Sequence, residues 1–275
     1  MNKQVAIAAV KRIAGSESRV DQDLVAVESP LTLTVSHPAR ATVRTLGVLM
    51  RTPGSDQDLV LGLLHAEGIV RTMADVVSVE VRAGEEADVG DVAHVTLAAT
   101  VDHDALPGER GLITTSACGL CGRLSVQSLD RGRGRSAPAP QFSADALASL
   151  PALLRDGQTA FAETGGLHAA ALFDGSGQRI ALAEDVGRHN AVDKVVGAAL
   201  RAGRVPASGS VLVVSGRVAF EIVQKAALAG AAAIVAVGAP SNLAIDAARA
   251  AGLMLVGFAR DGHFNVYAGM ERVTS

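Results

Sequence analysis

The stretch SVLVVSGRVAFEIVQKAALAGAAAIVAVGAPSNLAIDAARAAGLMLVGFA, residues 210–259, decides the fold class of this chain. Three almost wholly apolar runs alternate in it with two segments of helical pattern; the runs are 210–216, 232–238 and 253–259. Apolar strands that alternate with helices indicate a parallel sheet covered on both faces. Ligands of such sheets bind beyond the carboxyl ends of the strands. We therefore expect a binding site at "SGR" (215–217) and at "FARDGH" (258–263).

The residues just before this stretch continue the α/β pattern. Ser143 is a good N-cap for a helix over "ADALASLPALLRD", which Pro151 is expected to break. Two apolar runs flank the turn "GSGQ" (175–178) and predict a hairpin. The segment "GRHNAVDKVVGAALRAG" (187–203) has the period of an amphipathic helix. The C-terminal half is therefore expected to be one regular α/β unit.

The N-terminal half has a mixed pattern. Strands are predicted over 23–30, 31–36, 76–82 and 92–98. Between them a helix capped by Ser55 or Asp56 is expected to end near Gly68. With 275 residues the chain is near the limit for one hydrophobic core. The expected regions are a loose N-terminal arm (1–22), a smaller mixed α+β part (23–110), a mobile Cys-x-x-Cys loop with an Arg/Gly/Pro linker (111–140), and an α/β cofactor-binding domain (141–275).

Composition excludes several classes of partner. Aromatic residues make up only 3% of the chain and tryptophan is absent, which argues against a stacking surface for single-stranded nucleic acid. The formal net charge of −3 provides no overall field for a polyanion. The apolar run 5–10 is too short for a secretory signal, and the longest uncharged stretch, 226–245, is interrupted by glycine and proline. We therefore expect a cytoplasmic protein with neither nucleic acid nor membrane as a partner.

Both cysteines lie in "TTSACGLCGR" (114–123), as Cys118 and Cys121. In a reducing compartment such a pair indicates catalysis, redox chemistry or metal binding rather than a structural disulfide. Arg110 and Arg123 bracket the pair, and nearby cations favour the thiolate. Spacing alone leaves four possibilities: a dithiol/disulfide couple, half of a four-cysteine zinc site in a dimer, two ligands of a catalytic zinc site, or a carrier of persulfide sulfur.

The sequence also contains an imitation of a zinc deaminase signature. "HAE" (65–67) followed by "CGLC" resembles H-x-E … P-C-x-x-C. Ala117 stands where the proline is required, and His65 and Glu67 lie near the end of a predicted helix rather than at its start. A zinc site is therefore the weaker interpretation.

Polar residues at helix starts and strand ends predict an anion site. Cations and free N–H groups at a helix N-terminus attract anions. Such residues occur after Gly187, in the turn after the strand 210–216, and after the strand 253–259. The alternative at each place is an ordinary surface turn or helix face whose charged side chains are solvated. The candidate ligand contacts are Arg188, His189, Asn190, Lys194, His168, Ser215, Gly216, Arg217, Phe258, Ala259, Arg260, Asp261, Gly262, His263 and Asn265.

Taken together, these segments resemble the formate dehydrogenase accessory sulfurtransferase family, FdhD/NarQ. The stretches that carry the resemblance, in this order, are "LMRTPGSDQDLVLGLLHAEGIV", "SACGLCGR", "ETGGLHAAAL", "EDVGRHNAVDKVVG", "SGRVAFEIVQKAALAG" and "GFARDGHFNVYAG". Each is weak alone, but the six in register cover roughly residues 23–270. A mild departure is the small apolar joint "AAAIVAVGAPSN" (231–242), where relatives are expected to be more polar.

The resemblance implies a function. It implies a sulfurtransferase that takes sulfur from a cysteine desulfurase as a persulfide and passes it to molybdenum bis(molybdopterin guanine dinucleotide), required by the formate dehydrogenase apoenzyme. Cys118 then resembles the persulfide-bearing cysteine, Cys121 its partner, and "FARDGH" the cofactor contact.

The resemblance further implies a cytidine-deaminase-like α/β/α C-terminal fold, a homodimer, and no metal ion of the protein's own. Two alternatives of other classes stay open at this point: a non-catalytic chaperone for the cofactor, and a zinc protein using the Cys-x-x-Cys pair. A redox dithiol is a third.

Overall fold

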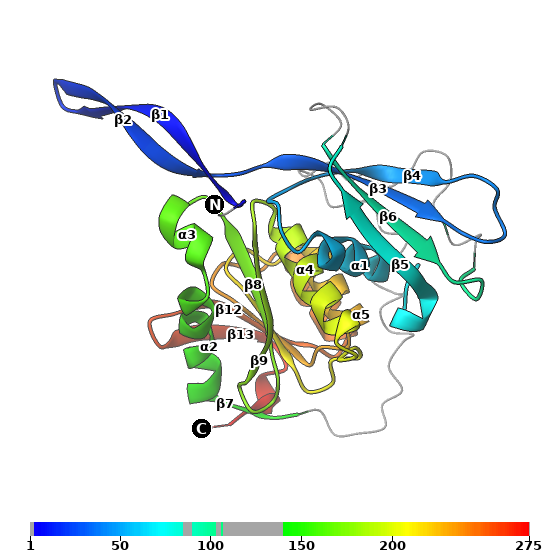
Figure 1. Cartoon of the computed structure of the whole chain (residues 1–275). Coiled ribbons are helices and arrows are strands. Elements are labelled where there is room, and N and C mark those ends of the chain that lie inside the picture. The colour runs from blue at the N-terminus through cyan, green and yellow to red at the C-terminus, as the bar shows by residue number, and fades with distance from the viewer. Residues whose placement is uncertain (1–2, 85–89, 103–105, 107–139, 275) are drawn as a thin grey trace.

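The computed structural model describes residues 3–84, 90–102, 106 and 140–274. Within these ranges the chain forms a mixed α/β fold with a large sheet, a smaller sheet and a projecting hairpin (Figure 1). Cys118 and Cys121 lie outside the described residues, as does most of the predicted loop and linker over 111–140.

The large sheet has six strands in the order β13-β12-β11-β10-β8-β9. As predicted, β10, β11 and β12 are parallel, and β8 and β9 form an antiparallel hairpin beside them. β13 closes the other edge as an antiparallel strand. The strands are β8 (His168–Phe173), β9 (Arg179–Asp185), β10 (Val211–Val214), β11 (Ala233–Ala236), β12 (Met254–Arg260) and β13 (His263–Ala268).

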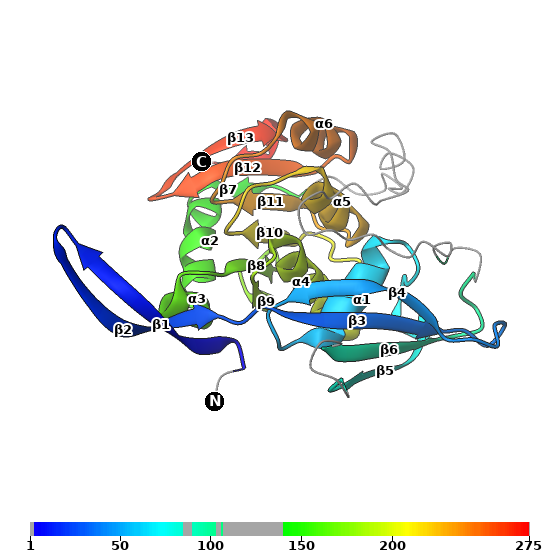
Figure 2. The ribbon, with the colours of Figure 1, turned by 90° about the horizontal axis from the view of Figure 1, so that it is seen from above.

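Helices cover both faces of this sheet, which confirms the layer prediction (Figure 2). α4 (Arg188–Arg201), α5 (Phe220–Leu228) and α6 (Asn242–Ala250) pack on one face through a core rich in alanine and valine. α2 (Ala144–Asp156) packs on the other face through Leu147, Leu150 and Leu154. The Ser143 side chain caps α2 as predicted, accepting a hydrogen bond from the Ala146 amide at 3.1 Å. The expected break at Pro151 is wrong, because α2 continues through it.

The smaller sheet has the order β4-β3-β6-β5 and packs one face on α1. Its elements are β3 (Ser29–Ser36), β4 (Arg44–Arg51), α1 (Asp56–Ala66), η1 (Met73–Asp75), β5 (Val76–Arg82) and β6 (Asp91–Leu97). The predicted helix and the predicted strands over 31–36, 76–82 and 92–98 are therefore present. The predicted strand 23–30 is wrong, because these residues are divided between the strands 17–26 and 29–36, and β4 was not predicted. Ser55 precedes α1 with φ of 54°, but its side chain accepts no capping hydrogen bond.

α1, which packs on the smaller sheet, is in direct contact with α4, which packs on the large sheet. At Gly62 of α1 and Gly197 of α4 the two backbones touch. A Cβ atom on Gly62 would lie 1.9 Å from the carbonyl oxygen of Asp193, and one on Gly197 would lie 1.9 Å from that of Asp58. Glycine at both positions is therefore what allows the helices to approach this closely.

The N-terminal residues form a ribbon rather than the loose arm expected over 1–22. β1 (Val5–Ala14) and β2 (Glu17–Ala26) pair antiparallel along their whole length and project from the body beside α3 (Thr159–Thr164) (Figure 1). Gly15, with φ of 62°, supplies the turn whose small residues had suggested disorder. The register places exposed Ile7, Ile13, Val20 and Leu24 on one face. Arg12 forms ion pairs with Asp21 and Asp23 on the other face.

The remaining described elements close the C-terminal unit. β7 (Phe142–Ser143) pairs with β14 (Val273–Thr274), and η4 (Met270–Arg272) precedes β14. No helix in the described part of the chain has the length and apolar character needed to cross a membrane.

Candidate functional site

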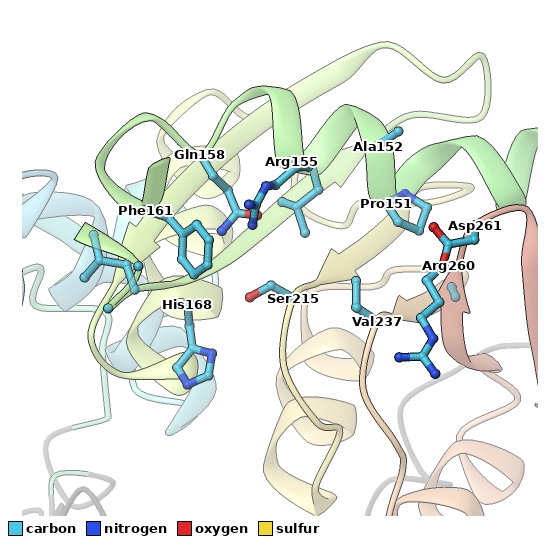
Figure 3. A pocket seen from close by; sticks show the side chains of 15 residues that line it. Pro151, Ala152, Arg155, Gln158, Phe161, His168, Ser215, Val237, Arg260 and Asp261 are labelled. Carbon is cyan, nitrogen blue, oxygen red and sulfur yellow. The ribbon is translucent and has the colours of Figure 1, made fainter. Parts of the chain in front are cut away.

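The carboxyl ends of the parallel strands meet the start of β8 at one edge of the large sheet, where ligand binding was predicted. Ser215 follows β10, Val237 follows β11, and Arg260 ends β12. With His168 at the start of β8, these residues line a cavity of about 620 Å³ (Figure 3). That volume lies within the range of small-molecule sites. The predicted residues that line it are His168, Ser215, Ala259, Arg260 and Asp261.

The opposite wall comes from α2, α3 and the loop that follows α3. These residues were not predicted, because a covering helix and a short connector carry no motif that distinguishes them. The double glycine at 165 and 166 was the one sequence signal that could have indicated this wall, because glycine allows a ligand to approach the backbone closely. The unpredicted lining residues are Pro151, Ala152, Leu154, Arg155, Gln158, Phe161, Gly165, Gly166, Leu167 and Val237.

Hydrogen bonds hold the centre of the site in place. The Ser215 hydroxyl accepts from the Ala169 amide at 2.9 Å, and the Ser215 amide donates to the Ala169 carbonyl at 3.0 Å. This ties the end of β10 to the start of β8. A Cβ atom on Gly216 would lie 3.4 Å from the His168 ring and 3.7 Å from the Arg188 side chain. His168, Gly216 and Arg188 are therefore neighbours at the rim of the cavity.

The segment "FARDGH" is a β-hairpin. Asp261 and Gly262 form a two-residue turn between β12 and β13, with φ of 51° and 76°, as a type I′ turn requires. The Asp-Gly dipeptide is a strong hairpin signal and could have predicted this turn. Phe258 also has a positive φ, 54°, where the pairing of β12 with β13 shifts register. The turn places Arg260 and Asp261 on the cavity, whereas Phe258, Gly262, His263 and Asn265 are not among its lining residues.

The rim of the cavity is cationic. Within the described ranges, Arg188, Arg217 and Arg260 form no ion pair with a carboxylate. Burial lowers the pKa of His168, and the charges of Arg188 and, more weakly, Arg217 lower it further. An imidazole with a lowered pKa is neutral at pH 7. The unpaired guanidinium groups can therefore receive an anionic ligand.

His189 lies behind this rim, between α4 and α5. Burial, together with the charges of Arg188, Lys225 and His168, lowers its pKa to about 4. Its Nε2 is buried without a hydrogen bond among the described residues, and the Glu221 carboxylate is 4.0 Å away. The ring is therefore neutral at pH 7 and is costly to protonate in the folded state.

We predict that His189→Gln weakens the acid sensitivity of the fold. The unfolded chain protonates this ring near pH 6.5, the folded chain near pH 4. Stability contributed by the neutral ring is therefore complete above pH 6.5 and falls as the pH drops from 6.5 to 4. Between pH 7 and pH 5 the variant should lose about 1 to 2 kcal/mol less than the wild type, measured by denaturant unfolding. Parallel stability curves for the two proteins would contradict this assignment.

Lys194 and Asn190 lie in a buried network rather than on the cavity. The Lys194 ammonium is 2.7 Å from the Asp185 carboxylate, and both side chains are at most 1% exposed. It also donates to the carbonyls of Thr52 and Glu184 at 2.8 and 3.2 Å. The Asn190 amide donates to Asp185 and to the Met50 carbonyl. The network therefore joins α4 and β9 to the segment between β4 and α1.

His65, which stands at the place of a zinc ligand in the deaminase-like sequence pattern, packs inside the protein. His65 is buried at the end of α1, and its Nδ1 is 2.9 Å from the Val70 carbonyl oxygen. Among the residues that the structure describes, no three His, Cys, Asp or Glu side chains are grouped as metal ligands. The two cysteines are not among those residues.

Comparison with known proteins links this arrangement to one family. A model of the FdhD/NarQ family matches residues 26–274. The sulfur carrier protein FdhD of Nocardia farcinica (strain IFM 10152) is 47% identical over 256 residues, 92% of this chain and 89% of the relative. The protein of the same name from Anaeromyxobacter sp. (strain K) is 51% identical over 264 residues, with the same two coverages, 92% and 89%.

The fold also matches a solved structure. A crystal structure described as a formate dehydrogenase accessory protein from Desulfotalea psychrophila superposes with a TM-score of 0.72. It covers 98% of this chain and 100% of its own, at 21% sequence identity. At that identity the likeness establishes a shared fold.

Proposed function

Because the chain belongs to the FdhD/NarQ family, we propose that it is a sulfurtransferase that carries sulfur as a persulfide from a cysteine desulfurase to molybdenum bis(molybdopterin guanine dinucleotide). The client is the formate dehydrogenase apoenzyme. One observation carries the proposal: a cavity at the carboxyl edge of the sheet has unpaired arginines at its rim, in a chain whose only cysteines form a Cys-x-x-Cys pair. Sulfur carriage is the function named for its relatives.

The sulfur-carrying chemistry is assigned to Cys118 and Cys121. The Cys118 thiolate attacks the terminal sulfur of the donor's persulfide, the donor's S–S bond breaks, and the donor leaves as a thiolate. Cys118 then carries the persulfide. Attack by the Cys121 thiolate on the Cys118 sulfur releases the terminal sulfur as sulfide and leaves a Cys118–Cys121 disulfide. The two thiols thus supply both electrons needed to reduce the transferred sulfur.

The acceptor is a substrate with two nucleotide arms and several phosphates. Arg260, Arg217 and Arg188 supply cations at the rim, and the N-termini of α4 and α5 add partial positive charge. Asn190 and Lys194 support this rim from behind through Asp185, whose carboxylate also accepts from the Gly187 amide at 2.8 Å. The proposal includes a homodimer and a cytidine-deaminase-like C-terminal fold, both implied by the family resemblance, and a cytoplasmic location.

The test is sulfur loading of the full chain. Incubation with a cysteine desulfurase and cysteine, then alkylation and tryptic digestion, should add about 32 Da, one sulfur atom, to the 111–123 peptide that follows Arg110. We expect Cys118→Ala to abolish this step and to abolish formate dehydrogenase activity in cells. Ser116→Ala, in the same peptide, is the matched control.

Two results would count against the proposal. Full formate dehydrogenase activity in cells that carry Cys118→Ala and Cys121→Ala would favour a cofactor chaperone. Stoichiometric zinc in the purified protein, lost on mutation of either cysteine, would favour a metal site.

A further inference from the structure

One face of the β1–β2 ribbon is apolar and exposed. Residues that pair directly across an antiparallel ribbon share a face, so Ile7 and Leu24 lie together, as do Lys11 and Val20. Ile7, Val20 and Ile13 are 68%, 81% and 70% exposed, and Leu24 is 40% exposed. The aliphatic stem of Lys11 can lie along such a surface with its ammonium at the edge. In a single copy of the chain, this face therefore leaves in water the kind of side chains that proteins bury.

The opposite face of the ribbon forms its polar interactions within the chain. Arg12 pairs with Asp21 and Asp23 at 3.1 and 3.0 Å, and Arg19 pairs with Asp21 at 3.2 Å. A two-stranded hairpin is marginally stable alone in water and gains stability when it packs against another element. The face that remains for such packing is the apolar one.

The base of the ribbon is fixed to the body of the protein. The Val27 amide donates to the Gln4 carbonyl at 2.9 Å, which extends the pairing of the two strands. Ala26 lies against the loop after α3, where a Cβ atom on Gly166 would be 3.4 Å from the Ala26 Cβ. Only residues 27–28 separate β2 from β3, and the ribbon and the four-stranded sheet extend in opposite directions from this junction (Figure 1 and Figure 2). The ribbon is therefore an arm with a defined direction.

The four-stranded sheet presents an outer face at the other side of the junction. Leu31 and Leu33 of β3 are buried on the side of α1, so Thr32 lies on the opposite, outer face. Val48 of β4 pairs with Thr32 and is 49% exposed. Met50, two residues further along β4, is on the same face and 41% exposed. The outer face therefore carries exposed apolar side chains near the junction with the ribbon.

Alternation along the line of β2 and β3 relates these two faces. Leu24 and Thr32 are an even number of residues apart, and an extended chain turns alternate side chains to the same side. The apolar face of the ribbon and the outer face of the sheet therefore lie on one side of this line. Leu24 is about as far before the junction as Thr32 is after it. A two-fold axis at the junction lays each ribbon on the sheet of the other copy, so the contact forms twice.

The area of contact distinguishes this exchange from other ways to cover the ribbon. With ten residue pairs the ribbon is about 34 Å long and about 10 Å wide, so one face covers about 340 Å². Two ribbons packed face to face, or a different protein on the ribbon alone, would bury about 700 Å² in total, the size of a lattice contact. Exchange between two copies buries a ribbon face and a sheet face on each, about 1,400 Å² in total, which a stable dimer needs.

We propose that the chain dimerises by reciprocal exchange of these arms. The ribbon face at Ile7, Val20 and Leu24 packs on the outer sheet face at Val48 and Met50 of a second copy. The inference deepens the proposed function by naming the surfaces of its homodimer, and it rests on that proposal for the homodimer alone.

Sedimentation equilibrium of the full chain tests the ribbon face. Leu24→Lys should raise the dimer dissociation constant at least about 100-fold, because the symmetric dimer carries the change twice. Val25→Lys is the matched control, because Val25 is 39% exposed and lies on the opposite face of the ribbon. That variant should change the dissociation constant less than about 3-fold. Both side chains are exposed in the single copy, so both variants should keep the circular dichroism spectrum of the wild type.

A mixture of two defective variants tests the exchange itself. Val48→Glu changes the receiving face and should weaken the dimer as Leu24→Lys does. In a mixed dimer both changes fall in one of the two contacts, and the other contact is wild type. The mixture should therefore dimerise at least about 10-fold more tightly than either variant alone. Packing of ribbon on ribbon predicts instead that Val48→Glu has no effect and that mixing restores nothing.

Three results would overturn the inference: a wild type that is monomeric at every concentration measured, equal effects of Leu24→Lys and Val25→Lys, or no gain on mixing. Sulfur loading of the 111–123 peptide, measured on the same proteins, separates this inference from the proposed function. Sulfur loading by a wild type that fails these tests would remove the arm exchange alone. A dimer that passes them but does not load sulfur would remove the sulfurtransferase proposal alone.

Discussion

Replacing Gly62 or Gly197 with alanine is expected to destabilise the protein by about 3 kcal/mol or more, or to prevent folding. Alanine in a helix normally stabilises it by about 0.5–1 kcal/mol relative to glycine. Here each new Cβ would lie 1.9 Å from a carbonyl oxygen of the facing helix, and backbone cannot give way as a flexible side chain can. α1 and α4 must therefore separate, which opens the cores on both sides of the contact.

Denaturant unfolding of the purified variants measures this effect. Gly175→Ala is the control, because the nearest atom to its new Cβ would be 3.6 Å away and its φ is not positive. That variant should change the free energy of unfolding by less than about 0.5 kcal/mol. A stability gain in Gly62→Ala or Gly197→Ala, as helix propensity alone predicts, would mean that the two helices do not touch.

Lys194→Met is expected to cost about 3–5 kcal/mol of folding stability. The substitution leaves the Asp185 carboxylate, which has no exposed surface, without its counter-ion. The carbonyls of Thr52 and Glu184 lose a donor at the same time. Since this network joins the N-terminal segment before α1 to α4 and β9, the loss should appear as a lower midpoint of global unfolding.

The control for this prediction is an ion pair on the surface. Arg249 and Asp246 are 3.8 Å apart with side chains more than 60% exposed, so Arg249→Met should have an effect below about 0.5 kcal/mol. Lys194 was also predicted from the sequence to contact the cofactor. Unchanged stability of Lys194→Met combined with weakened GDP binding would favour that role over the structural one.

Local pattern determined much of the C-terminal architecture. Apolar runs such as 211–214 and 233–236 are typical of strands buried on both faces, and the intervening helical periods indicate parallel crossovers. That arrangement also brings Ser215 and Arg260 to one edge of the sheet. The positions of these two site residues follow from periodicity and topology, which depend on near neighbours in the chain.

Local patterns were less informative at glycine, serine and aspartate, because these residues occur in loose segments, in tight turns and in ligand contacts alike. Gly15 and Ser16 suggested a loose arm and instead form the turn of a ribbon. Asp261 and Gly262 were interpreted as ligand contacts, although they also form the tight turn between β12 and β13. Whether such residues form a hairpin turn depends on whether the backbone N–H and C=O groups of the flanking segments pair with each other as strands.

The sequence by itself determined the α/β class, the sheet edge at which the site lies, the Cys-x-x-Cys pair and the family. Only the tertiary structure decided that Gly62 meets Gly197, that Lys194 is buried against Asp185, and that Gln158 and Phe161 form a wall of the cavity. The physical reason is the range of the interactions. Periodicity and turn chemistry act within a few residues, whereas close packing and charge burial depend on which distant segments meet.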